Sequence, residues 1–167
     1  MGKDALNLEG DSLLMDRVIY GNSSIKSAFD IALYDIAAQH AGLPLYAFLG
    51  GKNNRKLFTD YTVSLGPAEK MVSDAQKIKA AGFPVIKVKL GDSPDRDIER
   101  IRQIRASIGP EIPLRLDANQ GWDASTALQV LQEMAPFNIQ FCEEPIPRHD
   151  FMLLPEISAR STIPVMA

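Results

Sequence analysis

The chain has 167 residues, of which 46% are hydrophobic and 23% are charged, as in a globular protein with one sizeable core. The formal net charge is −3 and the basic residues are scattered, which argues against a nucleic-acid or anionic-membrane partner. One cysteine, Cys142, excludes an internal disulfide, and the absence of a signal-peptide layout or a bilayer-length apolar run predicts a cytoplasmic protein.

The first third of the chain is expected to hold one long helix. Residues 1–23 are polar and should be irregular. A helix should follow, because Ser23 or Ser24 can cap it and because apolar side chains then recur at helical spacing. These apolar positions are Ile25, Ala28, Phe29, Ala32, Leu33 and Ile36. Gly42 and Pro44 should end the helix, and a short apolar turn and a basic connector follow.

From Thr59 onward, strand-like and helix-like segments alternate without a break. The predicted strands are 59–65, 85–90, 114–118, 139–143 and 163–167. The predicted helices between them are 68–81, 94–107, 124–134 and 151–160. This alternation is typical of right-handed parallel βαβ units, and it fits either an open doubly wound sheet or part of a (β/α) barrel.

The distribution of polar side chains decides between these two architectures. Each of the first three strands has one apolar face and one polar face. The polar faces carry Asp60, Thr62 and Ser64, then Lys87 and Lys89, then Arg115, Asp117 and Asn119. A sheet covered on both faces would have near-continuous apolar strands, whereas a barrel keeps its active-site residues inside, at the carboxyl ends of its strands. We therefore predict an α/β fold that is a partial (β/α) TIM-like barrel of about five parallel strands.

Lys87 and Lys89 form the most informative pair. Buried lysines are rare without a partner, and two neighbouring ammonium groups should lower the pKa of each other toward the working pH. A neutral lysine is what a general base requires. The alternative is a strand edge that leaves both amines in water. Acids at matching positions on the next two strands favour an inward-facing pair.

Asp117 ends the third strand, and Glu143 ends the fourth with Glu144 beside it. Carboxylates that converge from neighbouring strands suit a hard cation such as Mg²⁺. Asp117 could instead be a capping or turn acid. The strand periodicity leaves open which of Glu143 and Glu144 faces inward, and Glu144 is expected to form a salt bridge with an arginine.

Three runs, KVKLG at 87–91, LRLDANQGW at 114–122 and FCEEPIP at 141–147, together resemble the muconate-lactonising subgroup of the enolase superfamily. The segment SIKSAFDIALYDIAAQHAGLPLYAFLGG at 24–51 is similar to the part of the family's capping domain that leads into the barrel. TDYTVSLG at 59–66 is most similar to the first barrel strand of the L-Ala-D/L-Glu (dipeptide) epimerases. The likeness covers nearly the whole chain.

The resemblance implies a Mg²⁺-dependent epimerase or racemase that removes the proton α to a carboxylate, as in a dipeptide such as L-Ala-L-Glu. By matching motif positions, it implies that Lys89 is the base on one face of the substrate and that Lys87 tunes this base and helps to hold the substrate carboxylate. Asp117 and Glu143 match the first two metal ligands. The superfamily is a known example of a lysine base acting beside Mg²⁺.

The same resemblance implies that Thr62 contacts the substrate and that Asn119 lies near the metal. It assigns residues 1–57 to the end of the capping domain and its connector, and residues 58–167 to the first half of the barrel. We therefore expect a fragment that is inactive by itself, with a small-molecule carboxylate or dipeptide as its ligand. Unpaired first and fifth strands also predict a homo-oligomer.

Other activities remain compatible with these motifs. The o-succinylbenzoate synthases, N-acylamino acid racemases and muconate cycloisomerases share the paired lysines and the two acids. A catalytically inactive half-barrel that acts only in self-association is a further alternative. Trp122 and Cys142 are expected to be packing residues.

Overall fold

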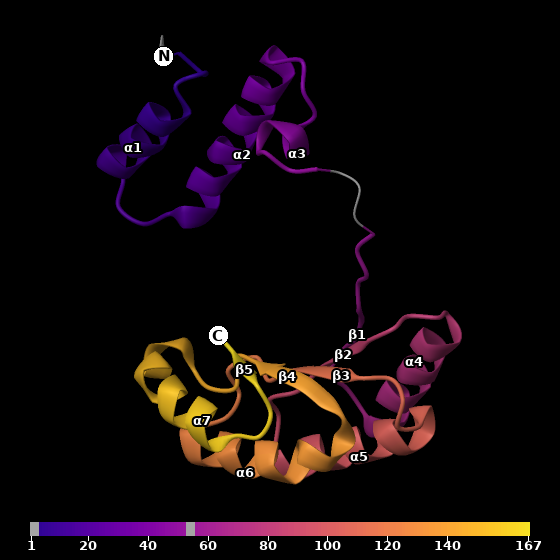
Figure 1. The fold of residues 1–167 in the computed structure, drawn as a ribbon. Coiled ribbons are helices and arrows are strands. Elements are labelled where there is room, and N and C mark those ends of the chain that lie inside the picture. The colour runs from indigo at the N-terminus through magenta and orange to yellow at the C-terminus, as the bar shows by residue number, and fades with distance from the viewer. Residues whose placement is uncertain (1–3, 53–55) are drawn as a thin grey trace. The chain divides into compact units, whose positions relative to one another are not determined.

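The computed structural model describes residues 4–52 and 56–167, and the contacts divide the chain into two compact units on either side of Leu57. The first unit contains α1 (Leu8–Val18), α2 (Ser23–His40) and the short α3 (Leu45–Phe48) (Figure 1). Helix α1 packs against α2, where Lys26 Nζ lies 2.8 Å from Asp16 Oδ1. Helix α2 begins at Ser23, so Asn22 takes the N-cap position instead of the predicted Ser23 or Ser24, and Ile25 and Phe29 of the predicted apolar face are exposed.

The prediction that residues 1–23 are irregular is wrong for Leu8–Val18, which is helical. Asn7 caps this helix, because its side-chain oxygen accepts a hydrogen bond from the backbone N–H of Gly10 at 3.3 Å. Acidic residues in the first turn and a basic residue in the last turn also favour the helix. Gly10, a poor helix former inside the first turn, obscured this pattern in the sequence.

The second unit is built on one parallel sheet in the order β1-β2-β3-β4-β5. Its strands are β1 (Tyr61–Val63), β2 (Ile86–Lys89), β3 (Leu114–Asp117), β4 (Ile139–Glu143) and β5 (Val165–Met166). Its α-helices are α4 (Ala68–Ala80), α5 (Pro94–Ile108), α6 (Ala124–Met134) and α7 (Leu154–Arg160), and two 3₁₀ turns cover Ala135–Phe137 and Arg148–Leu153.

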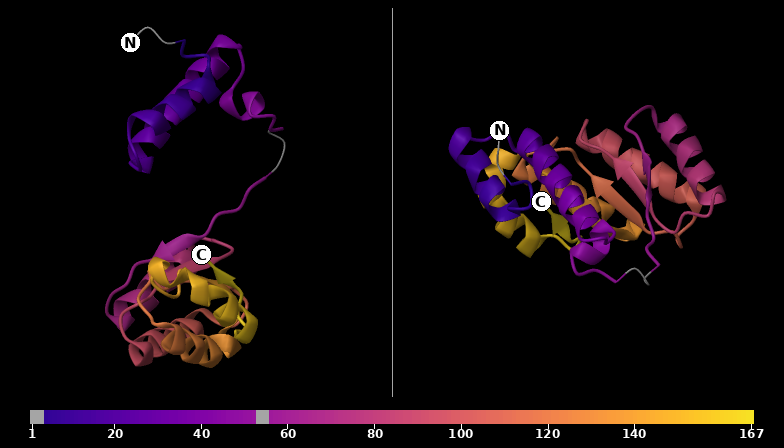
Figure 2. Two further views of the ribbon diagram at one scale, coloured as in Figure 1. Left: turned by 90° about the vertical axis from the view of Figure 1, so that its left-hand side faces the viewer. Right: turned by 90° about the horizontal axis from the view of Figure 1, so that it is seen from above.

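The arrangement of these elements confirms the partial barrel. The strand order is sequential and never reverses, whereas a doubly wound sheet reverses its order at a switch point. Within this unit the helices lie on one side of the sheet, as Figure 1 shows and as the two views in Figure 2 confirm. A sequential parallel sheet with helices on one side is a segment of a (β/α) barrel.

The core lies between the sheet and this helix layer. Ile86 and Val88 of β2 and Leu114 and Leu116 of β3 are fully buried, as the alternating pattern predicts. The apolar stripe of α5, formed by Ile98, Ile101, Ile104 and Ile108, is buried against them. Each fully buried aliphatic side chain contributes roughly 1.5–3 kcal/mol. None of the helices in the described residues is long and apolar enough to cross a membrane.

Two glycines allow the loop after β2 to touch the loop after β3. Gly91 has φ +103°, and a Cβ atom at this position would lie 2.1 Å from the carbonyl oxygen of Ala118. A Cβ atom at Gly121 would lie 2.3 Å from the carbonyl oxygen of Gly91. The two loops therefore meet backbone to backbone, at a distance that only glycine permits.

We expect Gly91→Ala to lower the free energy of unfolding by roughly 2–5 kcal/mol, because the alanine adds backbone strain at positive φ and a clash with Ala118. Urea unfolding of the chain measures this loss. Gly82→Ala is the matched control, since Gly82 has φ +82° but nothing within 4 Å of its Cβ position. Equal losses for the two variants would show that the close approach of the loops contributes nothing.

The outer edges of the sheet have no strand partner in the part of the chain that the structure describes. There β1 pairs with β2 alone and β5 with β4 alone. Tyr61 and Met166 on these edge strands are 55% and 42% exposed. Unpaired edges with exposed apolar side chains favour strand pairing with another chain.

We expect the 167-residue chain to form dimers or larger assemblies in solution, detected by light scattering over a range of protein concentrations. Tyr61→Lys should reduce this association, because a charged side chain on an edge strand disfavours further pairing. A sharp monomer peak at every concentration would contradict the expectation.

Candidate active site

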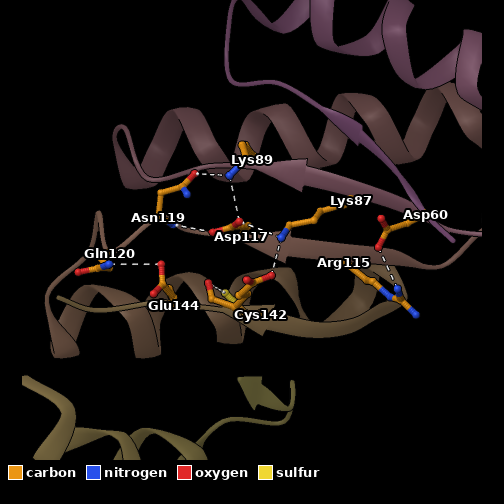
Figure 3. A network of polar contacts seen from close by, with 10 residues as sticks. Asp60, Lys87, Lys89, Arg115, Asp117, Asn119, Gln120, Cys142 and Glu144 are labelled. Atoms are coloured by element: carbon orange, nitrogen blue, oxygen red, sulfur yellow. Dashed lines mark hydrogen bonds and ion pairs between the residues drawn. The ribbon is translucent and has the colours of Figure 1, made fainter. Parts of the chain in front are cut away.

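Polar side chains of three neighbouring strands meet on the face of the sheet opposite the helix layer (Figure 3). The strand register places Lys89 of β2 beside Asp117 of β3, and Asp117 beside Glu143 of β4. Each of these is the last residue of its strand. Since parallel strands end at the same edge of a sheet, the register alone gathers them where barrel enzymes keep their active sites.

One connected set of ion pairs joins four residues, namely Lys87, Lys89, Asp117 and Glu143. Lys87 Nζ lies 2.9 Å from Asp117 Oδ2 and 2.5 Å from Glu143 Oε2. Lys89 Nζ lies 3.1 Å from the same Oδ2 of Asp117 and donates a weaker hydrogen bond to Asn119 Oδ1 at 3.4 Å. The other oxygen of Asp117, Oδ1, accepts a hydrogen bond from the backbone N–H of Asn119 at 3.0 Å. Asp117 is therefore the centre of the set.

These contacts change the protonation behaviour of the central pair. Burial raises the pKa of Asp117, but hydrogen bonds from Lys87 and Lys89 lower it more, so the pKa of this carboxyl lies below its usual value. Burial lowers the pKa of Lys87, but its hydrogen bonds to Glu143 and Asp117 outweigh burial and raise this pKa. The prediction that the neighbouring amines lower each other's pKa is therefore wrong for Lys87, because the carboxylates lie against its ammonium group.

The inward-facing acid of β4 is Glu143 and not Glu144. Glu144 has φ +42°, and its side chain accepts a hydrogen bond from Gln120 Nε2 at 3.3 Å, as Figure 3 shows. The predicted salt bridge between Glu144 and an arginine is therefore wrong within the described residues. The left-handed backbone turns the chain at the end of β4, so Glu144 lies beside the loop after β3 rather than inside the sheet face.

Gln120 is a residue whose role the sequence did not reveal. Its amide nitrogen donates to Glu144, and its Oε1 accepts a hydrogen bond from the backbone N–H of Arg148 at 3.0 Å. It therefore ties the loop after β3 to the loop after β4. Only its place in the run LRLDANQGW hinted at such a role, since glutamine in a loop is otherwise uninformative.

A second ionic group lies on the same face, nearer the amino ends of the strands. Arg115 Nη1 is 2.9 Å from Asp60 Oδ2 and Arg115 Nε donates to Gln140 Oε1 at 2.9 Å. The guanidinium carbon also lies 5.3 Å from the ring centroid of Phe141. The sequence placed Asp60 and Arg115 on the polar face, but their pairing across β2 depends on the strand order (Figure 3).

Thr62, the predicted substrate contact, pairs in register with Lys87 on the neighbouring strand. It lines a cavity of about 500 Å³ between β1 and α4. The other residues of this cavity are Tyr61, Ser64, Asp74, Lys77, Ile78, Ala81 and Phe83. Neither the paired lysines nor the two acids border it, so the structure brings Thr62 next to the ionic set without joining it to that set.

Asp117 and Glu143 could hold a divalent cation. Mg²⁺ prefers carboxylate oxygens, keeps several of its waters and is commonly bound through one or two carboxylates. The two acids fit this preference in kind and number, and Asn119 adds an amide oxygen nearby. Over residues 4–52 and 56–167, no group of three or more His, Cys, Asp or Glu side chains is placed to hold a metal.

The two predicted packing residues are confirmed. The Trp122 side chain is 2% exposed, and its indole N–H donates to Asp97 Oδ2 at 3.1 Å. Cys142 is fully buried, and burial raises the pKa of its thiol to about 12. A protonated, buried thiol is neither a nucleophile nor a metal ligand at neutral pH.

Comparison with known proteins agrees with this architecture. Residues 1–50 match the family described as "Mandelate racemase / muconate lactonizing enzyme, N-terminal domain", and residues 70–167 match "Enolase C-terminal domain-like". The chain is 56% identical to the D-Ala-D/L-Ala epimerase of Cytophaga hutchinsonii and 40% identical to the L-Ala-D/L-Glu epimerase of Clostridium acetobutylicum. All of the chain is covered in both comparisons, but only 45% and 47% of these relatives.

A solved structure gives the same result. The dipeptide epimerase of Cytophaga hutchinsonii, crystallised with Mg and the dipeptide D-Ala-L-Val, superimposes with a TM-score of 0.97 at 56% identity. The superposition covers 100% of this chain and 45% of that one, so the chain spans less than half the length of the relatives it matches. With both domain families matched along its length, the chain belongs to the enolase superfamily.

Proposed function

We propose that the full-length protein, meaning the complete polypeptide to which this chain belongs, is a Mg²⁺-dependent dipeptide epimerase. In this proposal residues 58–167 are the first half of the catalytic barrel, and residues 1–57 are the end of its capping domain. The observation that carries the proposal is the contact of two amines with two carboxylates at the ends of adjacent strands. Relatives that are named as dipeptide epimerases support it.

The chemistry requires removal of a weakly acidic proton. A proton on the carbon beside an ionised carboxylate is hard to remove, because its removal places further negative charge on that group. Mg²⁺, held by Asp117 and Glu143, would supply positive charge beside the substrate carboxylate. Lys87, which contacts both acids, would add a second positive charge there.

Lys89 is the better candidate for the base. Its side chain is 38% exposed, compared with 20% for Lys87, so its Nζ is the amine that is more accessible from the open face of the sheet. In the proposal, Lys89 Nζ takes the α-proton from one face of the substrate. Inversion needs a proton donor on the opposite face, and we expect a later strand of the barrel to provide it.

The proposed substrate class is the dipeptides, and Thr62 on β1 is the proposed contact to the substrate. The names of the two relatives specify different dipeptides, one with alanine and one with glutamate as the epimerised residue. The proposal therefore covers dipeptides with a free carboxylate, and L-Ala-L-Glu is one member of the set to be tested.

The test is hydrogen exchange in the full-length protein. With Mg²⁺ in D₂O, proton NMR should show loss of the α-proton signal from L-Ala-L-Glu, D-Ala-D-Ala or a related dipeptide, followed by signals of the epimer. N-acylamino acids and cis,cis-muconate in parallel samples distinguish the racemase and cycloisomerase alternatives. A protein that exchanges no dipeptide, or that turns over only an alternative substrate, would contradict the proposal.

The 167-residue chain alone should show no epimerisation of these dipeptides. In the proposal the two amines and the two carboxylates of its described residues all lie on a single face of the substrate, and an inverting reaction also needs a group on the opposite face. The same NMR assay measures this, with the full-length protein as the positive control. Turnover by the chain that EDTA abolishes would refute the expectation.

A further inference from the structure

A buried carboxylate on α5 links the loop after β2 to the loop after β3. Asp97 is completely inaccessible to solvent. Its Oδ2 accepts hydrogen bonds from the backbone N–H groups of Gly91 at 3.0 Å and Asp92 at 3.1 Å, and from the indole N–H of Trp122 at 3.1 Å. Its Oδ1 accepts from Arg100 Nη1 at 2.8 Å. One side chain therefore binds two separate loops and its own helix.

Both loops continue directly from the candidate active site. Gly91 lies two residues beyond Lys89, and Trp122 lies three residues beyond Asn119. The backbone of Asn119 in turn donates the hydrogen bond to Asp117 Oδ1. The direction of Lys89 and the position of Asn119 thus depend on how the two loops are held together.

Burying a carboxylate is costly, which indicates that the hydrogen bonds around Asp97 have a specific role. A buried charge is strongly unfavourable unless it is paired and fully hydrogen-bonded, and Asp97 meets this condition through four donors. Hydrogen bonds to a charged acceptor are also roughly twice as strong as those between neutral groups. An acid that served only to favour the first turn of α5 could do so while exposed. Three of the four donors to Asp97 lie outside α5, in the two loops.

We infer that Asp97 is a positioning residue for the reaction, which holds the loops after β2 and β3 so that Lys89, Asp117 and Asn119 keep their mutual geometry. The inference rests on the proposed function. Asp97 touches none of the proposed reacting groups and acts only through Gly91, Asp92 and Trp122. The close backbone approach of the two loops at Gly91 and Gly121 is independent support, since it shows that the loops pack as one unit.

Asp97→Asn in the full-length protein tests the inference with almost no change of shape. The asparagine oxygen can accept the hydrogen bonds from the loops or the one from Arg100, but it cannot accept both, because an NH₂ donor replaces the other carboxylate oxygen. We expect kcat for dipeptide exchange, per folded molecule, to fall roughly 10- to 100-fold, the usual cost of losing a group that orients active-site residues. KM should change much less, because the residues proposed to bind substrate remain.

A spectroscopic readout follows the loop itself. Trp122 is the only tryptophan in the 167-residue chain, so the fluorescence of this chain reports on the loop after β3 without interference. In the 167-residue chain carrying Asp97→Asn, the emission should shift to longer wavelength and acrylamide should quench it more strongly, because the indole loses its partner. Trp122→Phe in the full-length protein removes only the indole donor and should lower kcat by a smaller factor. It serves as the second test if Asp97→Asn does not fold.

Two variants of α5 are matched controls. Glu99→Gln removes a nearby carboxylate that pairs with exposed Arg102, and Ile101→Val removes a buried methyl group from the same helix. Neither residue bonds to either loop, so both variants should keep the wild-type kcat per folded molecule. An inactive wild-type protein would overturn the proposed function and this inference with it. An active wild type, with kcat and Trp122 emission unchanged in Asp97→Asn or with kcat unchanged in Trp122→Phe, would overturn the inference alone.

Discussion

Replacing Lys89 with methionine in the full-length protein should slow exchange of the substrate α-proton by roughly 10²- to 10⁴-fold, the usual contribution of a general base. Methionine keeps an unbranched apolar side chain but has no amine to accept the proton. Proton NMR in D₂O measures the exchange rate, and thermal melting verifies that the variant is folded.

The matched control for this prediction is Lys70→Met on α4. Lys70 is 66% exposed and pairs with Asp74, away from the two acids of the candidate site. Its loss should leave the exchange rate unchanged. If Lys89→Met kept more than a tenth of the wild-type rate, the base would have to be another group.

The second large effect concerns Mg²⁺ and Asp117. A ligand that binds only the folded protein stabilises it by about 2.7 kcal/mol at a hundred times its Kd. We therefore expect Mg²⁺ to raise the Tm of the full-length protein, and Asp117→Ala to abolish this increase. Titration with MgCl₂ during thermal melting measures the effect, and Ca²⁺-free buffer and an EDTA sample set the baseline.

Glu144→Ala is the control for this second prediction. Glu144 is adjacent to Glu143 in sequence, but its side chain bonds to Gln120 and not to the lysines. Its loss should leave the Mg²⁺ response intact. If Mg²⁺ still raised the Tm of Asp117→Ala, the metal would have to bind elsewhere. If Mg²⁺ did not raise the Tm of the wild type, the inactive, self-associating alternative would be favoured.

The local predictions succeeded where one stretch of chain contains all the information. The strands and helices after Thr59 lie within a few residues of their predicted positions, because alternation and helical spacing are properties of neighbouring residues. Helix α1 was missed because Gly10 and a polar composition do not indicate a helix in the sequence, although Asn7 caps and stabilises one. The buried role of Asp97 was also missed, since an acid in the first turn of a helix is normally an exposed dipole partner.

The sequence by itself determined which face of its strand each polar side chain occupies, and hence that Lys87, Lys89 and Asp117 face the same way. Side-chain direction follows from the pleat of a strand, which is local. Strand periodicity left open whether Glu143 or Glu144 faces this group, and only the family resemblance favoured Glu143. The tertiary structure places Glu143 there and binds Lys87, 56 residues from Glu143, between the acids. Such contacts depend on strand order and register, and these are set by the packing of distant segments rather than by any local pattern.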